Sequence, residues 1–196
     1  MNMRCSELGA RRSHRGHVGG FTVVELVITL LIGAVIIAFA APSFRSMVIS
    51  NRLTTVANEV VDAINVARME AVKRNGNVQF CSDSATVNTT GNALGDKCGV
   101  QGGAVYALSV DNSGNPQLDP VRTDIHELAS SLTITGNIVA LRFNGQGLGV
   151  KPGTSMPYSG TVIDICSPNL NADNHRIVRM VAGSILEVVP NPGSCT

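Results

Sequence analysis

The chain has 196 residues, a formal net charge of +1 at pH 7, 44% hydrophobic and 4% aromatic residues, and no tryptophan. This length allows one domain with a sizeable core, and the near-neutral charge argues against a nucleic-acid protein that depends on bulk charge. Apolar residues are concentrated near the N-terminus, which argues against an ordinary cytosolic enzyme.

The N-terminal residues 1–20 are basic, with four arginines and the single acid Glu7. An uncharged apolar run follows from Leu26 to Phe44. As a helix it would be about 29 Å long, close to the thickness of a bilayer core. Because the run has no polar face, it predicts a membrane span with a cytoplasmic N-terminus and an exported C-terminal part. A secretory signal peptide cut after Ala40 or Ala41 is the alternative.

Glu25 stands at the start of the apolar segment, where an ionised carboxylate is costly unless it has a partner or a function. The residues from Gly20 to Leu26, Gly-Phe-Thr-Val-Val-Glu-Leu, resemble the processing site of type IV pilins and type II secretion pseudopilins. The resemblance implies that a prepilin peptidase cuts after Gly20 and methylates the new N-terminal Phe21. The freed amino group of Phe21 would then pair with Glu25 of a neighbouring subunit as helices pack together. Alternatively, the Glu25 carboxylate reaches up to the lipid headgroups.

Pro42 lies at the far end of the apolar run, where it would kink the helix, as pilins of this family often show, or would begin a new helix. Apolar residues then recur every three or four positions, which predicts an amphipathic helix. These residues are Ile49, Leu53, Val56, Val60, Ala63, Ala67 and Ala71. A basic last turn and Gly76 predict that the helix ends near Arg74. We therefore expect one nearly continuous helix from about Phe21 to Arg74.

The C-terminal residues 76–196 are rich in glycine and proline, with short Val- and Ile-rich runs between turn residues. These runs predict strands at 78–81, 104–110, 132–135, 138–143, 161–166, 177–181 and 185–189, while 121–128 is ambiguous. The predicted fold class is α+β, with a long N-terminal α-helix packed against a C-terminal antiparallel β-sheet head. The expected organisation is a leader (1–20), a transmembrane and assembly helix (21–44), an amphipathic helix (45–75) and a periplasmic head (76–196).

Four of the five cysteines fall in the head, and an even number in an exported domain predicts disulfides. They are Cys81, Cys98, Cys166 and Cys195. Of the three possible pairings we expect the local one, Cys81–Cys98 and Cys166–Cys195. A zinc site is the alternative, but no CxxC spacing occurs and His126 and His175 stand alone in the sequence. No metal and no other cofactor is therefore expected.

Motifs that carry catalysis are absent from the sequence, which has no GxSxG, no phosphate-binding loop and no HExxH. We therefore expect a protein that is not an enzyme. The segment 111–116, Asp-Asn-Ser-Gly-Asn-Pro, predicts a hairpin turn. Its alternating oxygen ligands also resemble a calcium loop, although the downstream bidentate Glu of such a loop is absent.

Residues 67–75, Ala-Arg-Met-Glu-Ala-Val-Lys-Arg-Asn, and the following residues 78–81 are similar to the helix end and first strand of the GspH/FimT-type minor pilins. The resemblance implies a single-pass inner-membrane protein with a periplasmic head, which primes pilus assembly or joins the pilus. The implied partners are other minor and major pilins, the prepilin peptidase, the inner-membrane assembly platform and membrane lipid. A minor pseudopilin of a type II secretion system is the second possibility.

Some members of this group bind DNA through a Gly-Arg-x-Arg motif near the C-terminus. The corresponding residues here, 183–186, lack both arginines. The nearest candidates are Arg176 and Arg179, which would lie on opposite faces of one strand. Because DNA affinity depends on phosphate neutralisation and acids outnumber bases in the head, we do not expect DNA as a partner. A DNA-binding minor pilin for DNA uptake is the third possibility.

Overall fold

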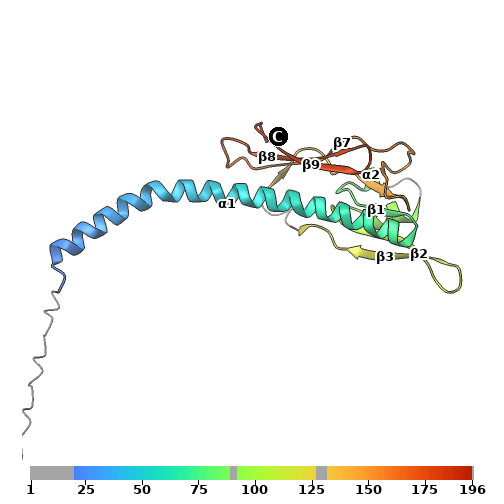
Figure 1. Cartoon of the computed structure of the whole chain (residues 1–196), viewed down its shortest axis with the longest axis horizontal. Helices are drawn as coiled ribbons and strands as arrows, with labels where there is room; N and C mark the ends of the chain where they lie inside the picture. The colour runs from blue at the N-terminus through green and yellow to red at the C-terminus, as the bar shows by residue number, and fades with distance from the viewer. Residues whose placement is uncertain (1–19, 89–91, 127–131, 196) are drawn as a thin grey trace, which may run out of the picture. The chain divides into compact units, whose positions relative to one another are not determined.

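The computed structural model describes residues 20–88, 92–126 and 132–195. The chain divides into two compact units, Met1–Pro42 and Ser43–Thr196, and each is described here by itself. The expected leader lies outside the described residues except for Gly20, as does part of the ambiguous segment 121–128. The α+β fold class is confirmed: one long N-terminal helix is followed by antiparallel strands (Figure 1).

Helix α1 (Val23–Arg74) begins two residues later than the sequence predicts. Thr22 caps it, because its Oγ1 accepts a hydrogen bond from the backbone N–H of Glu25 at 3.2 Å. The helix continues through Pro42 without a break, so the alternative of a new helix that begins at Pro42 is wrong. In the first unit, every helical residue except Gly33 is exposed.

From Ser43 onward, α1 carries the buried stripe that the sequence predicts. Its fully buried members are Leu53, Val56, Ala57, Val60, Ala63, Ile64, Ala67 and Ala71. Ile49 is partly buried against the same cluster. The helix ends at Asn75, whose φ of 47° is left-handed, and the N–H of Gly76 donates to the carbonyl of Ala71 at 3.1 Å. The left-handed residue that ends the helix is thus Asn75 rather than Gly76.

Two antiparallel sheets form the rest of the second unit, and Figure 1 shows both beside the second half of α1. One sheet has the order β3-β2-β1-β5-β6, and the other has the order β4-β7-β8-β9. The strands of the first sheet are β1 (Val78–Phe80), β2 (Val105–Val110), β3 (Pro116–Arg122), β5 (Leu141–Phe143) and β6 (Gly149–Val150). Those of the second are β4 (Thr133–Ile134), β7 (Gly160–Cys166), β8 (His175–Val181) and β9 (Ile185–Asn191).

The main core cluster joins both sheets to the buried stripe of α1. Phe80 and Phe143 from the first sheet, and Ile163 and Met180 from the second, are among its largest fully buried side chains. The two sheets also meet at the turn between β8 and β9. There Gly183 has a φ of 69°, and a Cβ on it would lie 2.7 Å from the carbonyl oxygen of Gly149, so only glycine fits.

Four elements were not predicted: strands β3 and β6 and the short helices α2 (Ala85–Asn88) and α3 (Ala93–Cys98). Strand β3 contains Pro116 and Pro120, and proline weakens a strand pattern in sequence. It lies at the edge of its sheet, where a missing N–H is tolerated. The hairpin turn predicted at 111–116 is confirmed, because Asp111 accepts hydrogen bonds from the N–H groups of Ser113 and Asn115 at 2.9 and 2.8 Å.

Candidate functional site

The first part of α1 presents a continuous apolar surface that nothing in the first unit covers. Phe21, Leu30 and Phe39 are 77%, 65% and 78% exposed, and this is the one helix among the described residues that is long and apolar enough to cross a membrane. An apolar surface of this extent is unfavourable in water. Such a surface favours an apolar environment supplied from outside the first unit.

The residues predicted for leader cleavage and assembly lie at the start of this helix. Gly20 and Phe21 are exposed and precede the first helical turn, so the peptide bond between them is in a non-helical, accessible segment. Glu25 lies in the first turn and is exposed, and its carboxylate has no ion-pair partner within the described ranges 20–88, 92–126 and 132–195. An acid in this turn is favoured by the positive end of the helix dipole, and its side chain is available to a cation from another chain.

The four head cysteines are paired as the sequence predicts. Cys81 and Cys98 form one disulfide with a Cα–Cα distance of 5.5 Å, and Cys166 and Cys195 form the other with a distance of 5.9 Å. The first pair is fully buried in a small cluster with Leu94 and Ala104, so it fixes α3 against strands β1 and β2. The second pair joins the end of β7 to the C-terminal tail.

The guanidinium of Arg176, a candidate DNA contact, forms hydrogen bonds to other groups of the same chain. It donates to Ser50 Oγ at 3.1 Å and Thr54 Oγ1 at 3.2 Å on α1, and to the backbone oxygens of Asp173 and His175 at 2.6 and 2.8 Å. These bonds connect β8 to α1. The structure therefore gives Arg176 a structural role, and its donors are not directed to an external phosphate.

Arg179, the other candidate, is exposed on the opposite face of β8, as the sequence predicts. Its neighbours across the sheet are Thr161 on β7 and Glu187 on β9. An acidic neighbour reduces the positive potential that a phosphate would meet. The two arginines therefore do not form one surface for DNA.

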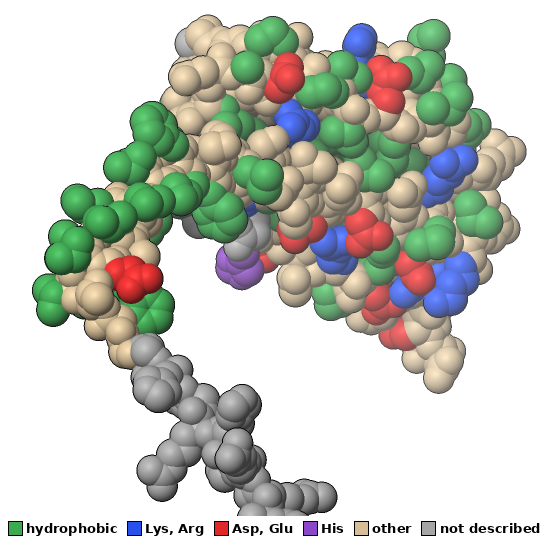
Figure 2. Space-filling model, turned by 60° about the vertical axis from the view of Figure 1, so that its left-hand side comes forward, with side chains coloured by type: hydrophobic (Ala, Val, Ile, Leu, Met, Phe, Trp, Pro, Cys, Tyr) green, Lys and Arg blue, Asp and Glu red, His purple; other side chains and the backbone are tan. Residues whose placement is uncertain are grey.

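Most other bases of the head are also engaged within the chain. Arg122 pairs with Asp62 at 2.8 Å, and Lys151 lies over the ring of Tyr158 at 5.2 Å. On the face drawn in Figure 2, basic and acidic side chains are intermixed rather than segregated. A concentrated basic stripe, the usual mark of a nucleic-acid surface, is not present on this face.

Arg142 is a partly buried base that the sequence does not mark as a site residue. Its Nη2 donates to Gln79 Oε1 at 2.5 Å and to Asn92 Oδ1 at 2.8 Å, and burial lowers its pKa. Gln79 is fully buried, and its amide donates to the carbonyl of Asn88 at 3.2 Å. These polar contacts connect β5 and β1 to the α2–α3 segment, so their role is structural. Sequence alone gives no signal for them, because the bonded residues are 9 to 63 positions apart.

The family model described as "Type II transport protein GspH" matches residues 56–183, which is more than half of the chain. No curated protein matches the chain. The crystal structure of the type IV minor pilin FimU of Pseudomonas aeruginosa is similar with a TM-score of 0.46 and 21% identity, covering 75% of this chain and 97% of that one.

Proposed function

We propose that this chain, which belongs to the family of the type II transport protein GspH and is type IV pilin-like, is a minor pilin of a type IV pilus. In this proposal it is held in the bacterial inner membrane by residues 21–44, with the head in the periplasm. A prepilin peptidase cuts after Gly20 and methylates Phe21. The role is structural, with no catalysis and no cofactor.

The observation that carries the proposal is the apolar first part of α1, which is exposed from Phe21 through Pro42 while the second unit has its own core. Lipid can cover this surface before assembly, and the helices of neighbouring subunits can cover it afterwards. Both environments are apolar, so moving the helix from one to the other has a small net hydrophobic cost. The same surface thus suits a subunit that is stored in a membrane and later joins a filament.

In this proposal Glu25 determines which chains assemble and how adjacent helices are aligned. A carboxylate within lipid is costly, and a cation from a neighbour reduces that cost. Cleavage after Gly20 would create such a cation, the α-amino group of Phe21. The pairing of Glu25 on one subunit with Phe21 on the next would set the stagger between adjacent helices. Uncut chains have no amino group at this position and would stay in the membrane.

A minor pseudopilin of a type II secretion system is the second candidate. The matching family favours it, because that family is named for a type II transport protein. The two candidates share the same helix and the same processing, and they differ in the filament that the subunit joins. A DNA-binding role for DNA uptake is disfavoured by the engaged Arg176 and the acidic neighbour of Arg179.

The proposal is tested on the chain expressed in cells that assemble pili. Intact-mass analysis of the membrane-extracted protein should show a chain that begins at Phe21 and carries one methyl group. The mature chain should also be recovered with filaments sheared from the cell surface. A chain that begins at Met1 or after Ala41 would contradict processing at Gly20, and recovery only with secretion pseudopili would favour the second candidate.

Gly20→Val is the matched control for processing, because it changes the residue before the cut and leaves the helix intact. We expect the variant to accumulate as an uncut precursor in the membrane and to be absent from sheared filaments. Incorporation of the uncut variant at the wild-type level would contradict the role of cleavage.

A further inference from the structure

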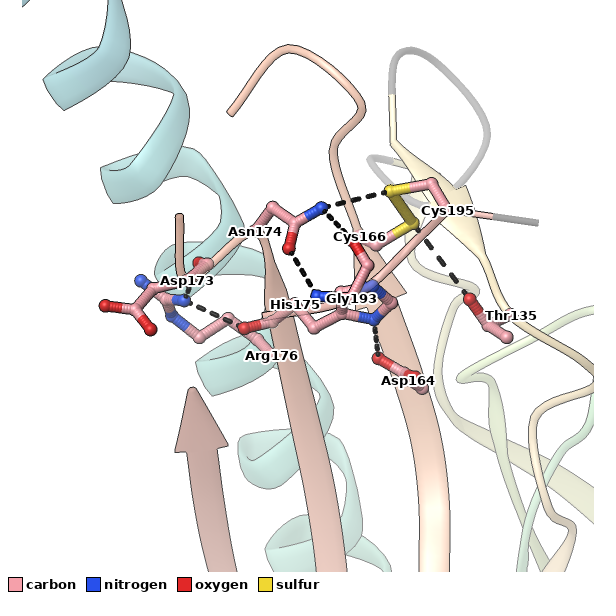
Figure 3. A network of polar contacts seen from close by, with 9 residues as sticks. All are labelled: Thr135, Asp164, Cys166, Asp173, Asn174, His175, Arg176, Gly193 and Cys195. Carbon is pink, nitrogen blue, oxygen red and sulfur yellow. Dashed lines mark hydrogen bonds and ion pairs between the residues drawn. A yellow bond between two sulfur atoms is a disulfide. The ribbon is translucent and has the colours of Figure 1, made fainter. Parts of the chain in front are cut away.

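His175 is a buried histidine with one ring nitrogen engaged and the other free of protein partners. It is the first residue of β8 and is 4% exposed. Its Nδ1 lies 2.9 Å from Asp164 Oδ1 on β7 (Figure 3). A carboxylate only accepts hydrogen bonds, so Nδ1 carries the hydrogen in this pair. The neutral ring then has its lone pair at Nε2.

Nε2 of His175 is buried and has no hydrogen-bond partner among the residues that the structure describes. Buried polar atoms without a partner are rare in native proteins. The space beside this nitrogen exists because residue 193 is glycine: a Cβ there would lie 2.8 Å from Nε2. The lone pair therefore faces a small space that a side chain would close.

Two sulfur atoms lie close to the His175 ring. Cys166 is directly opposite His175 in the pairing of β7 with β8, and Cys195 approaches from the tail. One ligand atom from each of the three residues lies within 4.8 Å of the others. In the sequence His175 stands alone, because the strand register that pairs it with Cys166 is not visible there.

Each of the two sulfur atoms has one polar donor beside it. Thr135 Oγ1 donates to Cys166 Sγ at 4.0 Å, and Asn174 Nδ2 donates to Cys195 Sγ at 3.8 Å (Figure 3). Asn174 also holds the tail in place through both backbone groups of Gly193, at 2.8 and 3.0 Å. Donors of this kind stabilise thiolates when the sulfurs are reduced. The tail position therefore has support that is independent of the disulfide.

We propose that Cys166, Cys195 and His175 bind a zinc ion when the Cys166–Cys195 disulfide is reduced. Two thiolates and one imidazole are ligands that Zn²⁺ prefers, and water would occupy the fourth position. Asp164 acts as a positioning residue, because a carboxylate on the second ring nitrogen fixes the orientation of a metal-binding histidine. The disulfide and the zinc site use the same sulfurs and exclude each other.

The exchange between the two states needs a dithiol reductant. Its two thiols become a disulfide, and Cys166 and Cys195 take up the two electrons and two protons as free thiols. Zn²⁺ then replaces both thiol protons, which are released to solvent. A newly made chain, whose cysteines have not yet been oxidised, enters the zinc state without the reductant. A disulfide oxidant reverses the sequence: its disulfide takes up two electrons and two protons to become two thiols, the Cys166–Cys195 bond forms again, and the metal is released.

The test uses the untagged full chain in detergent, reduced without oxygen by a phosphine, with Co²⁺ as a spectroscopic probe. A background of Cys5→Ser, Cys81→Ser and Cys98→Ser removes the other thiols. We expect one Co²⁺ per chain with thiolate-to-metal charge-transfer absorption, and displacement of Co²⁺ by Zn²⁺. The oxidised chain should give no such absorption. Loss of the signal on oxidation separates this site from the adventitious binding of Co²⁺ to surface acids.

Single variants in this background assign the ligands. Cys166→Ser and Cys195→Ser should abolish the charge-transfer band. His175→Gln should weaken Co²⁺ binding at least about 10-fold, and Asp164→Asn should weaken it about 10- to 100-fold while the stoichiometry stays the same. Lys97→Gln, on the exposed surface, is the control that should change nothing. Equal binding by wild-type His175 and by His175→Gln would overturn the proposal.

A second measurement uses the wild-type cysteines, in case the background does not fold. Zn²⁺ should protect Cys166 and Cys195 of the reduced chain from alkylation, and Cys81 and Cys98 in the same molecule serve as the internal control. If reduction unfolds the head, Zn²⁺ added before reduction should preserve its far-UV circular dichroism. Equal alkylation of all four cysteines, or unfolding that Zn²⁺ does not prevent, would refute the site. Neither outcome bears on the pilin role.

Discussion

Arg74 and Asp119 form an ion pair, 2.6 Å between Nη1 and Oδ2, that fastens the last turn of α1 to the edge strand β3. Arg74 also pairs through Nε with Glu70 at 2.8 Å. The hydrogen bond from Arg74 is the largest of the effects that lower the pKa of Asp119, and the same guanidinium, with help from Lys73, lowers the pKa of Glu70. One arginine thus holds two carboxylates in their charged forms.

This ion pair should make a small, pH-dependent contribution to stability. Because the folded pKa of Asp119 is below its ordinary value of 3.8, the contribution is present at neutral pH and is lost as the pH falls through the lowered pKa. Asp119→Asn should lower the melting temperature by a few degrees at most at pH 7, and the difference should vanish at low pH and shrink in high salt. Thermal denaturation followed by circular dichroism measures both trends. A difference that grows as the pH falls would contradict this explanation.

Leu53 should be important for the stability of the head because it is fully buried in the core. Leu53→Ala removes apolar contacts and leaves a cavity, so we expect a loss of about 2–5 kcal/mol in the free energy of unfolding. The matched control is Leu30→Ala, the same substitution in the same helix at a residue that is 65% exposed. Denaturant unfolding of the two variants in detergent should separate them. Similar losses in both would mean that the stripe is not the core of the head.

The two arginines of β8 should behave differently when replaced. Arg176→Ala leaves polar groups of α1 and β8 without their donor, so we expect it to destabilise the head by about 1–2 kcal/mol. Arg179→Ala changes an exposed side chain and should have little effect on stability. We expect the wild-type head to bind little DNA in a gel-shift assay, so neither variant should change the amount of DNA that is retained. Salt-dependent DNA binding that disappears in Arg179→Ala would support the DNA-uptake role.

Glu25 should affect assembly rather than folding. We expect Glu25→Ala to be cleaved normally but to be recovered in sheared filaments in smaller amounts, because the carboxylate that would pair with a neighbour is missing. Thr29→Ala is the control, since Thr29 Oγ1 donates only to the carbonyl of Leu26 in its own helix, at 2.9 Å. Immunoblots of membrane and sheared fractions compare the three chains. Equal incorporation of Glu25→Ala and the wild type would reject this role.

The sequence predicts the helical stripe and most strands well because their signals are local. Residues such as Val56 and Val60 repeat at helical spacing, and runs such as 161–166 and 185–189 are rich in Val and Ile. Strand β3 is not predicted because Pro116 and Pro120 weaken its strand pattern. Its pairing with β2 in the structure identifies it as a strand. The short helices α2 and α3 depend on contacts from the rest of the head, and their own sequences are too short to show a period.

Some site residues can likewise be found from a local motif, while the roles of others depend on contacts between distant parts of the chain. Gly20, Phe21 and Glu25 are visible in the sequence because they lie in one continuous motif. The use of Arg176 is not visible, since its acceptors Ser50 and Thr54 are more than a hundred residues away and become neighbours only when β8 packs on α1. The position of His175 next to Cys166 likewise depends on strand register, which hydrophobic pattern alone does not specify at the end of a hairpin.

The two prolines of β3 have a consequence for contacts between this head and a neighbouring chain. Proline has no N–H to offer, so Pro116 and Pro120 interrupt the row of donors along this outer strand. These two gaps disfavour the addition of a strand from a neighbouring head along this edge. The edge is thereby protected against sheet-to-sheet aggregation, and contacts made by its side chains remain open.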